Sequence, residues 1–215
     1  MARNIICKVW FDWNFDDVFT EETTNLVSAS GDTRMMPFGD SILNSSGIVD
    51  QCQIELRNVA GRYSALNSGG ALYAYIQSGG IYHVPVYVET SINNGSSYQR
   101  VFTGVTKLPR ETGKAVDGVP TVRFDCRGRD ELVLQKRYSS GAQYTKTRND
   151  AGFTDAEIIS AYLTAGGASP TSIDPGLITI PWSHMDDESI LEESWQVASA
   201  GAGRVYAQAD GTIAY

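Results

Sequence analysis

The sequence has few of the residues that enzymes and metal sites use. It contains two histidines, His83 and His184, and three cysteines, with no spacing typical of a metal-binding motif. The motifs GxSxG, HExxH and GxxxxGK[ST] are absent, as is a GxGxxG after a predicted strand. We therefore expect no enzymatic activity, and no bound metal or organic cofactor.

Long apolar runs are also missing. No run approaches the roughly 18 residues expected of a membrane span. The N-terminal segment reaches Asp12, Asp16 and Asp17 too early for a secretory signal. These absences predict a soluble protein that is made in the cytoplasm.

The charge is acidic overall and unevenly distributed. The formal net charge is -8 and the sequence pI is about 4.7, which is far from the basic character expected of nucleic-acid-binding domains. Residues 100–148 hold 11 basic and 5 acidic side chains, a net +6, whereas residues 149–215 hold 1 and 10, a net -9. This distribution indicates either pairing within the fold or complementary faces on identical subunits.

A two-residue apolar period predicts strands in the first 127 residues. Residues 51–57 and 121–127 both alternate apolar and polar side chains. Pro85 suggests an edge position or a strand start. The cysteines (Cys7, Cys52 and Cys126) lie in strand-like runs, where we expect buried free thiols. The predicted strands are 4–13, 51–57, 83–89, 100–107 and 121–127, and turn clusters lie at 30–32, 44–47, 93–95 and 117–118.

Helical patterns occur only later in the chain. Thr154 and Glu157 form a capping box ahead of an apolar stripe, which predicts a helix over 154–165. A second helix is predicted over 188–200, capped by Asp186 or Asp187, and a shorter one over 129–138. Asp210-Gly211 predicts a hairpin between 204–208 and 212–215.

These elements define a fold class and a domain division. We predict a mostly β fold with a smaller α+β part: β-barrel or sandwich modules plus two or three short helices. Residues 1–127 are assigned to a β-barrel-like domain. Residues 128–215 are assigned to an α+β domain, which can continue beyond this sequence.

Two residue clusters allow alternative functions. The acidic residues Asp186, Asp187, Glu188, Glu192 and Glu193 could serve paired-acid hydrolysis, but a solvated or interfacial helix face is the simpler interpretation. Asp16-Asp17 and Glu21-Glu22 are expected in an exposed loop. Aromatic residues could stack on sugar rings, although core packing is their default role in strands. These aromatics are Trp10, Phe11, Trp13, Phe15, Phe19, Tyr73, Tyr75, Tyr82 and Tyr87.

The segment 54–67 carries a family resemblance. Its strand runs into Gly61-Arg62-Tyr63-Ser64, with Ala65 where the family pattern usually has proline. Together with the strands 84–88 and 101–105 and the element order that follows, it resembles the N-terminal β-barrel part of baseplate hub or minor tail proteins of long-tailed bacteriophages. The resemblance extends over residues 1–215, but Gly61-Arg62-Tyr63-Ser64 is a turn and not a site.

The resemblance implies a structural protein of the virion. Such hubs form a ring, typically a homotrimer, at the tail tip. They link the tail tube and distal tail protein to a fibre or spike, and leave a lumen through which DNA passes without specific binding. The alternative is a carbohydrate-binding or receptor-binding β-module of a tail or secreted protein.

Two structural expectations follow. Gly61 should have a positive φ or a close neighbour. Ring contacts should join basic residues of the middle segment to acidic residues after 149, or to the loop around Asp16 and Glu21. The candidate interface residues are Arg123, Arg127, Arg129, Lys136, Arg137, Asp16, Glu21, Glu188 and Glu192.

Overall fold

The structure is a computed structural model that describes residues 5–36, 47–64, 66–73, 76, 83–134, 136–138, 144–145, 152–168 and 170–215. Contacts divide the chain into two compact units. The first comprises Met1–Asp32 and Asp50–Gly128, and the second comprises Thr33–Val49 and Arg129–Tyr215. Each unit is described by itself.

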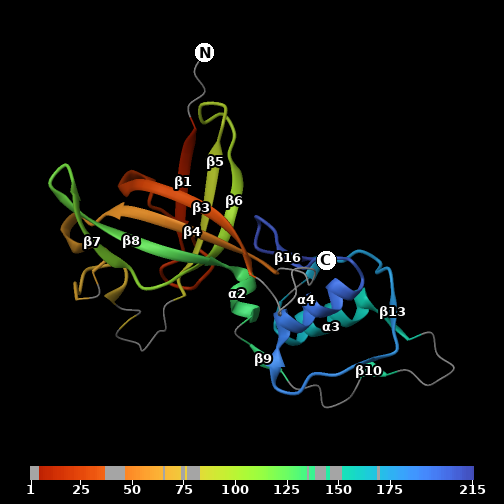
Figure 1. The fold of residues 1–215 in the computed structure, drawn as a ribbon. Coiled ribbons are helices and arrows are strands. Elements are labelled where there is room, and N and C mark those ends of the chain that lie inside the picture. Colours follow the sequence, from red (N-terminus) through yellow and green to blue (C-terminus); the bar gives the residue numbers. More distant parts are fainter. Residues whose placement is uncertain are drawn as a thin grey trace. The chain divides into compact units, whose positions relative to one another are not determined.

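The first unit is built on one strongly curled antiparallel sheet. Its strand order is β2-β1-β5-β6-β8-β4-β3, and β7 pairs with β8 beside this path. In Figure 1, β1, β5 and β6 run across the direction of β3, β4 and β8, so the sheet folds over its own apolar side. The strands are β1 (Ile6–Phe11), β2 (Thr20–Glu21), β3 (Leu26–Met36), β4 (Gly47–Arg57), β5 (Pro85–Ser91), β6 (Gln99–Thr106), β7 (Arg110–Val116) and β8 (Val119–Gly128).

The core of this unit follows from the alternation in its strands. Residues at every second position point inward and are buried, while their neighbours face outward. Gly104 on β6 lies so close to β8 that a Cβ would overlap the carbonyl oxygen of Arg127. Buried core residues include Val9, Phe11, Trp13, Ile54, Leu56, Tyr63, Val86, Val88, Phe102, Val122 and Phe124.

The second unit packs two helices against short strands. Helices α3 (Asp155–Ala165) and α4 (Ile190–Ala200) lie side by side (Figure 1), and α2 (Arg129–Leu134) contacts α4. The strands pair as β10-β14, β11-β13, β12-β17-β16 and β15-β9. They are β9 (Arg137–Tyr138), β10 (Tyr144–Thr145), β11 (Phe153–Thr154), β12 (Pro170–Ser172), β13 (Thr179–Ile180), β14 (Trp182–Ser183), β15 (Glu188–Ser189), β16 (Tyr206–Ala207) and β17 (Ile213–Ala214).

The core of the second unit lies between its helices. Ile158, Ile159 and Leu163 of α3 are fully buried, as are Ile190 and Leu191 of α4. Trp195 of α4 donates from Nε1 to the carbonyl oxygen of Val205 at 3.1 Å within this core. None of the described helices is long and apolar enough to span a membrane.

The mostly β prediction is confirmed, and most predicted elements are present. Pro85 starts a strand, but that strand lies between β1 and β6 and not at an edge. The Thr154–Glu157 capping box is present, and Asp210-Gly211 turns between β16 and β17.

Several local predictions were wrong, and two strands, β3 and β7, were missed. Residues 30–32 lie within β3 and form no turn, because pairing with β4 carries the strand through them. Strand β7 was not predicted. The helix expected over 129–138 ends at Leu134, and α4 is capped by Ser189, which accepts from Glu192 N, and not by Asp186 or Asp187. Of the turn predicted at 44–47, residues 44–46 lie outside the described residues, and Gly47 begins β4.

Candidate interaction surfaces

The Gly61–Ser64 turn is anchored to a buried carboxylate. Glu22, only 2% exposed, accepts hydrogen bonds at Oε1 from Arg62 Nη2 at 2.6 Å and from Trp13 Nε1 at 3.0 Å. Its Oε2 accepts from the Tyr63 hydroxyl at 2.7 Å and from Asn25 Nδ2 at 3.3 Å. The expectation that Glu22 lies in an exposed loop was wrong. Two of its partners, Arg62 and Tyr63, lie 40 and 41 positions away, and they help to draw the side chain into the unit.

The ionisation of Glu22 reflects these partners. Burial alone would raise its pKa, but the hydrogen bonds from Arg62, Tyr63 and Trp13 and the charge of Arg62 outweigh burial and lower the pKa. Burial and the adjacent carboxylate raise the pKa of Tyr63. The cluster therefore places the charged carboxylate of Glu22 against the neutral phenol of Tyr63. This arrangement is suited to stabilising the turn at residues 61–64.

The backbone of the turn is equally constrained. Gly61 has φ +71°, as predicted, and Ala60 before it has φ +51°. Asn67 Nδ2 donates to the carbonyl oxygens of both residues at 3.0 Å, and Asn58 Oδ1 accepts from Tyr63 N at 2.9 Å. These bonds hold the left-handed backbone in place, so the motif fixes a loop and its polar groups are used internally.

A second buried carboxylate, Asp155, starts α3. It accepts from the Tyr215 hydroxyl at 2.6 Å, from Ala156 N at 3.1 Å and from Leu177 N at 3.4 Å. Burial would raise its pKa, but these bonds lower it. Nothing local in the sequence marks Asp155 as buried, because Tyr215 lies 60 positions away.

Several predicted interface cations have partners within the chain. Arg123 Nε lies 3.4 Å from Asp125 Oδ1, and Arg137 Nε lies 3.2 Å from Asp187 Oδ1. Lys136 Nζ donates to the carbonyl oxygen of Gly166. These three cations support the interpretation of pairing within the fold.

The other predicted interface residues are placed as follows. Arg127 is half-buried on β8, and Arg129 is exposed at the start of α2. Glu21 pairs with Lys8 at 3.4 Å, and Asp16 is exposed, as is Asp17. The ring contacts themselves stay a prediction.

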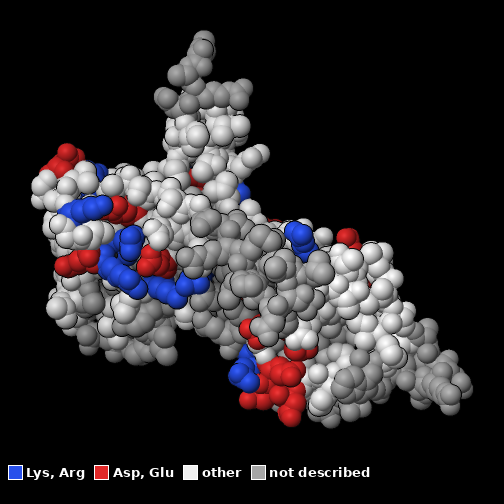
Figure 2. All heavy atoms as spheres, in the orientation of Figure 1, with Lys and Arg blue, Asp and Glu red and all other residues white. Residues whose placement is uncertain are grey.

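The acidic cluster at the start of α4 is crowded. Figure 2 shows acidic atoms gathered beside β9 and the start of α4. Burial and the carboxylates of Glu188 and Glu192 raise the pKa of Glu193 to about 7. Glu192 is exposed on α4, as predicted for a helix face, whereas Glu188 is exposed but lies in β15, before the helix begins.

Cys52 faces Cys126 across β4 and β8; both are buried free thiols, as predicted, while Cys7 is half-buried. The pKa of Cys52 is raised to about 12. Burial is the larger cause, and the nearby Cys7 raises the pKa further by a smaller amount. Within the described ranges, no three His, Cys, Asp or Glu side chains are arranged to hold a metal.

The aromatic residues are engaged with one another. Phe11 and Trp13 stack in the core with ring centroids 4.6 Å apart. On the outer face of β1 and β5, Trp10 stacks on Tyr87 with centroids 5.7 Å apart and planes 19° apart, and Arg100 lies 3.9 Å from the centre of the Tyr87 ring. Trp10 and Tyr87 are partly covered by these neighbours, whereas Phe15 is 41% exposed, and the sugar-stacking alternative is not tested. Tyr75 and Tyr82 lie outside the described residues.

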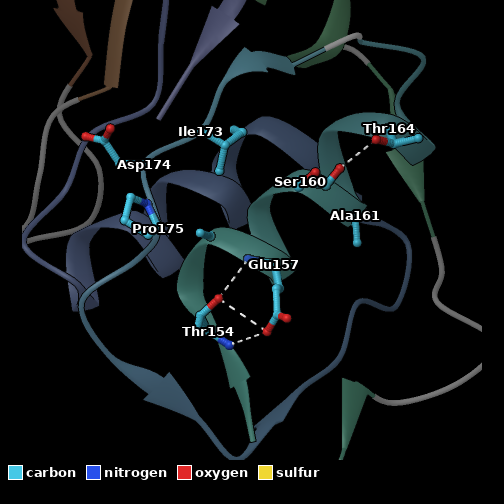
Figure 3. Close-up of a pocket in the computed structure, with 9 residues that line it drawn as sticks. Thr154, Glu157, Ser160, Ala161, Thr164, Ile173, Asp174 and Pro175 are labelled. Atoms are coloured by element: carbon cyan, nitrogen blue, oxygen red, sulfur yellow. Dashed lines mark hydrogen bonds between the residues drawn. The ribbon is translucent and has the colours of Figure 1, made fainter.

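A hollow of about 660 Å³ lies along α3 (Figure 3). Several of its polar groups form hydrogen bonds within α3 or at its start. Glu157 accepts from Thr154 N at 2.8 Å, and Thr164 Oγ1 donates to the carbonyl oxygen of Ser160 at 2.7 Å. The residues that line it are Thr154, Ala156, Glu157, Ser160, Ala161, Thr164, Ile173, Asp174 and Pro175.

Comparison with known proteins identifies the fold. No family model matches the sequence, and no curated protein matches it. A 43 kDa tail protein of prophage MuSo2 from Shewanella oneidensis is similar over 98% of this chain and 53% of its own, with 9% identity and a TM-score of 0.59. A tail protein from Neisseria meningitidis MC58 is similar over 98% of this chain and 50% of its own, with 9% identity and a TM-score of 0.52.

A third solved structure is a component of the type VI secretion system of E. coli, described as similar to the T4 bacteriophage tail proteins gp27 and gp5. It has 9% identity and a TM-score of 0.43 over 99% of this chain and 45% of its own. This chain spans about half the length of each of the three. The first two structures, with TM-scores above 0.5, show that this chain has a fold found in tail proteins, one of them from a prophage.

Proposed function

We propose that this chain is a structural subunit of a phage tail tip. It forms a hub ring, a homotrimer, that links the tail tube and distal tail protein to a fibre or spike and leaves a lumen for DNA. The observation that carries this proposal is the fold, which is shared over 98% of the chain with two tail proteins.

The side-chain arrangement is compatible with a structural role. The buried carboxylates Glu22 and Asp155 are each hydrogen-bonded by several groups of the same unit. Groups used in this way hold loops in position and are not available to a substrate. The protein is accordingly proposed to catalyse no reaction and to bind no cofactor.

Imaging the assembled tail tests the proposal most directly. We expect density for this chain in three equivalent positions around the tail axis, between the tube and the fibre or spike. Six equivalent positions around the tube would instead assign it to the distal tail ring. A location at a fibre tip, in contact with a host glycan, would contradict the proposed class.

A further inference from the structure

The turn that joins β5 to β6 contains the one Asn-Gly step in the sequence, Asn94-Gly95. Asn94 has φ +59° and Gly95 has φ +85°, as a type I′ turn requires at its two central positions. Ser96 N donates to the carbonyl oxygen of Asn93 at 3.4 Å and closes the turn. Asn94 is exposed, so water reaches its side chain.

An asparagine side chain can react with the backbone nitrogen that follows it. Gly95 N attacks Cγ of Asn94, its proton leaves with the side-chain amide group as ammonia, and a succinimide ring remains. Water then opens the ring at Cγ to leave an aspartate, or at the main-chain carbonyl to leave an isoaspartate. Glycine favours the attack because it has no Cβ to hinder the approach.

The neighbouring Asn93 is held in place and is followed by a residue with a side chain. Its Oδ1 accepts from the Ser91 hydroxyl at 2.7 Å and from Ser97 N at 3.1 Å, and its Nδ2 donates to Ser97 Oγ at 2.8 Å. The same reaction at Asn93 would have to break these bonds first. The turn therefore favours reaction at Asn94 over reaction at Asn93.

Ser91 holds the nitrogen that has to attack. Gly95 N donates to Ser91 Oγ at 2.9 Å, and Ser91 is only 1% exposed. The N–H proton thus points at a buried hydroxyl and away from any base in the solvent. The turn must open before the nitrogen can lose this proton and reach Cγ, so the rate depends on a local opening equilibrium.

We propose that Asn94 is a site of spontaneous deamidation and that Ser91 slows the reaction in the folded protein. Each event replaces a neutral amide with a carboxylate, and the isoaspartate product also lengthens the backbone at the turn. The turn lies against the start of β1, since a Cβ at Gly95 would be 3.4 Å from Ile6 Cδ1. Modified and unmodified chains therefore differ in charge at one end of the strands β1, β5 and β6 (Figure 1).

Peptide mapping by mass spectrometry tests the site and the role of Ser91. The full chain is incubated folded and in urea, and aspartate and isoaspartate are quantified at each asparagine. Asn94 should react first in both states, more slowly when folded, and faster as the pH rises, because the attacking nitrogen must lose its proton. Ser91→Ala should speed the folded reaction at least about fivefold, the factor that one hydrogen bond contributes to an opening equilibrium. Ser97→Ala removes a hydrogen bond of Asn93 and none of Gly95, and it is the matched control.

The outcomes separate the site from its protection. Modification of another asparagine before Asn94, or an unmodified Asn94 in the folded chain once the unfolded chain has reacted, would overturn the site. Equal rates for folded and unfolded wild type would overturn the protection, and so would equal effects of Ser91→Ala and Ser97→Ala. In urea, wild type and Ser91→Ala should react alike. The comparison of folded with unfolded wild type needs no variant, so it stays decisive if Ser91→Ala does not fold.

Discussion

Arg62 and Glu22 lie 40 positions apart in the sequence, and their side chains form an ion pair at 2.6 Å. The pair is asymmetric, because the Glu22 side chain is 3% exposed and that of Arg62 is 43% exposed. Glu22 is the anchor, and the turn at residues 61–64 closes over it. The turn that resembles the phage tail pattern is therefore explained by packing around one carboxylate.

Replacing Glu22 with Gln should destabilise the first unit. The amide cannot accept all the bonds that Arg62, Tyr63 and Trp13 donate, and hydrogen bonds to charged groups contribute about 1.5–3 kcal/mol. Urea unfolding should show a loss in that range. Glu21→Gln, the exposed neighbour, should change stability by less than about 1 kcal/mol. Equal effects of the two changes would contradict the anchoring role.

The same carboxylate predicts acid sensitivity. The folded-state pKa of Glu22 is lowered, so its ionisation stabilises the fold above the unfolded pKa of about 4.3. This contribution is lost as the pH falls through the folded-state pKa. The stability difference between wild type and Glu22→Gln should shrink on acidification below about pH 4. A difference that does not change with pH would argue against a charged Glu22.

Gly104 should tolerate no side chain. A Cβ would overlap the carbonyl oxygen of Arg127, so Gly104→Ala should force β6 and β8 apart and cost about 1–3 kcal/mol or more. Gly118→Ala is the control, since φ is +76° and nothing lies within 4 Å of its Cβ position. Its cost should be about 1 kcal/mol, from backbone strain alone. Urea unfolding of both variants distinguishes steric overlap from backbone strain.

Thr154→Ala should weaken the start of α3. The Thr154 hydroxyl accepts from Glu157 N at 3.2 Å, and loss of such a cap costs about 1 kcal/mol. Thr164→Ala, near the other end of the helix, removes a hydroxyl that caps no backbone N–H and should cost little. Unfolding free energies test both, and equal losses would show that the cap is not what stabilises this end.

Local features were predictable from the sequence, and non-local ones were not. The alternation around Ile54 and Phe124, the capping box at Thr154 and the positive φ of Gly61 all depend on neighbours within a few residues. Strand β3 was missed because Ser30-Gly31-Asp32 is typical of a turn. Its pairing with β4 outweighs that local preference.

For the charged residues, too, the sequence did not predict contacts between residues that are far apart in the chain. Glu22 follows Glu21 in a polar stretch, and its burial depends in part on Arg62 and Tyr63, which lie 40 and 41 positions away. Arg137 is a candidate interface residue from the sequence, and in the structure it forms an ion pair with Asp187, 50 positions away. The sequence shows which residues are charged, but the residue that each one pairs with depends on the fold.

Glu193 should make stability fall as the pH rises. Its pKa is raised to about 7 in the folded protein, against about 4.3 when unfolded. The folded chain therefore holds a proton that the unfolded chain releases, and this contribution is present below the unfolded pKa and lost as the pH rises through about 7. Glu193→Gln should remove that loss between about pH 5 and pH 8 in urea titrations. Parallel profiles for wild type and variant would contradict the shift.

The outer aromatic face should not bind glycans. Trp10 stacks on Tyr87 and donates from Nε1 to Glu89 Oε2 at 3.1 Å, and Arg100 lies over the Tyr87 ring. A sugar would have to displace these neighbours to reach a ring face, which costs the contacts they already make. Titration with cell-wall and surface polysaccharides should leave the tryptophan fluorescence unchanged. Arg100→Ala uncovers one face of Tyr87 and serves as the comparison. Saturable quenching of the wild type that is lost on replacing Trp10 with Ala would revive the carbohydrate-binding alternative.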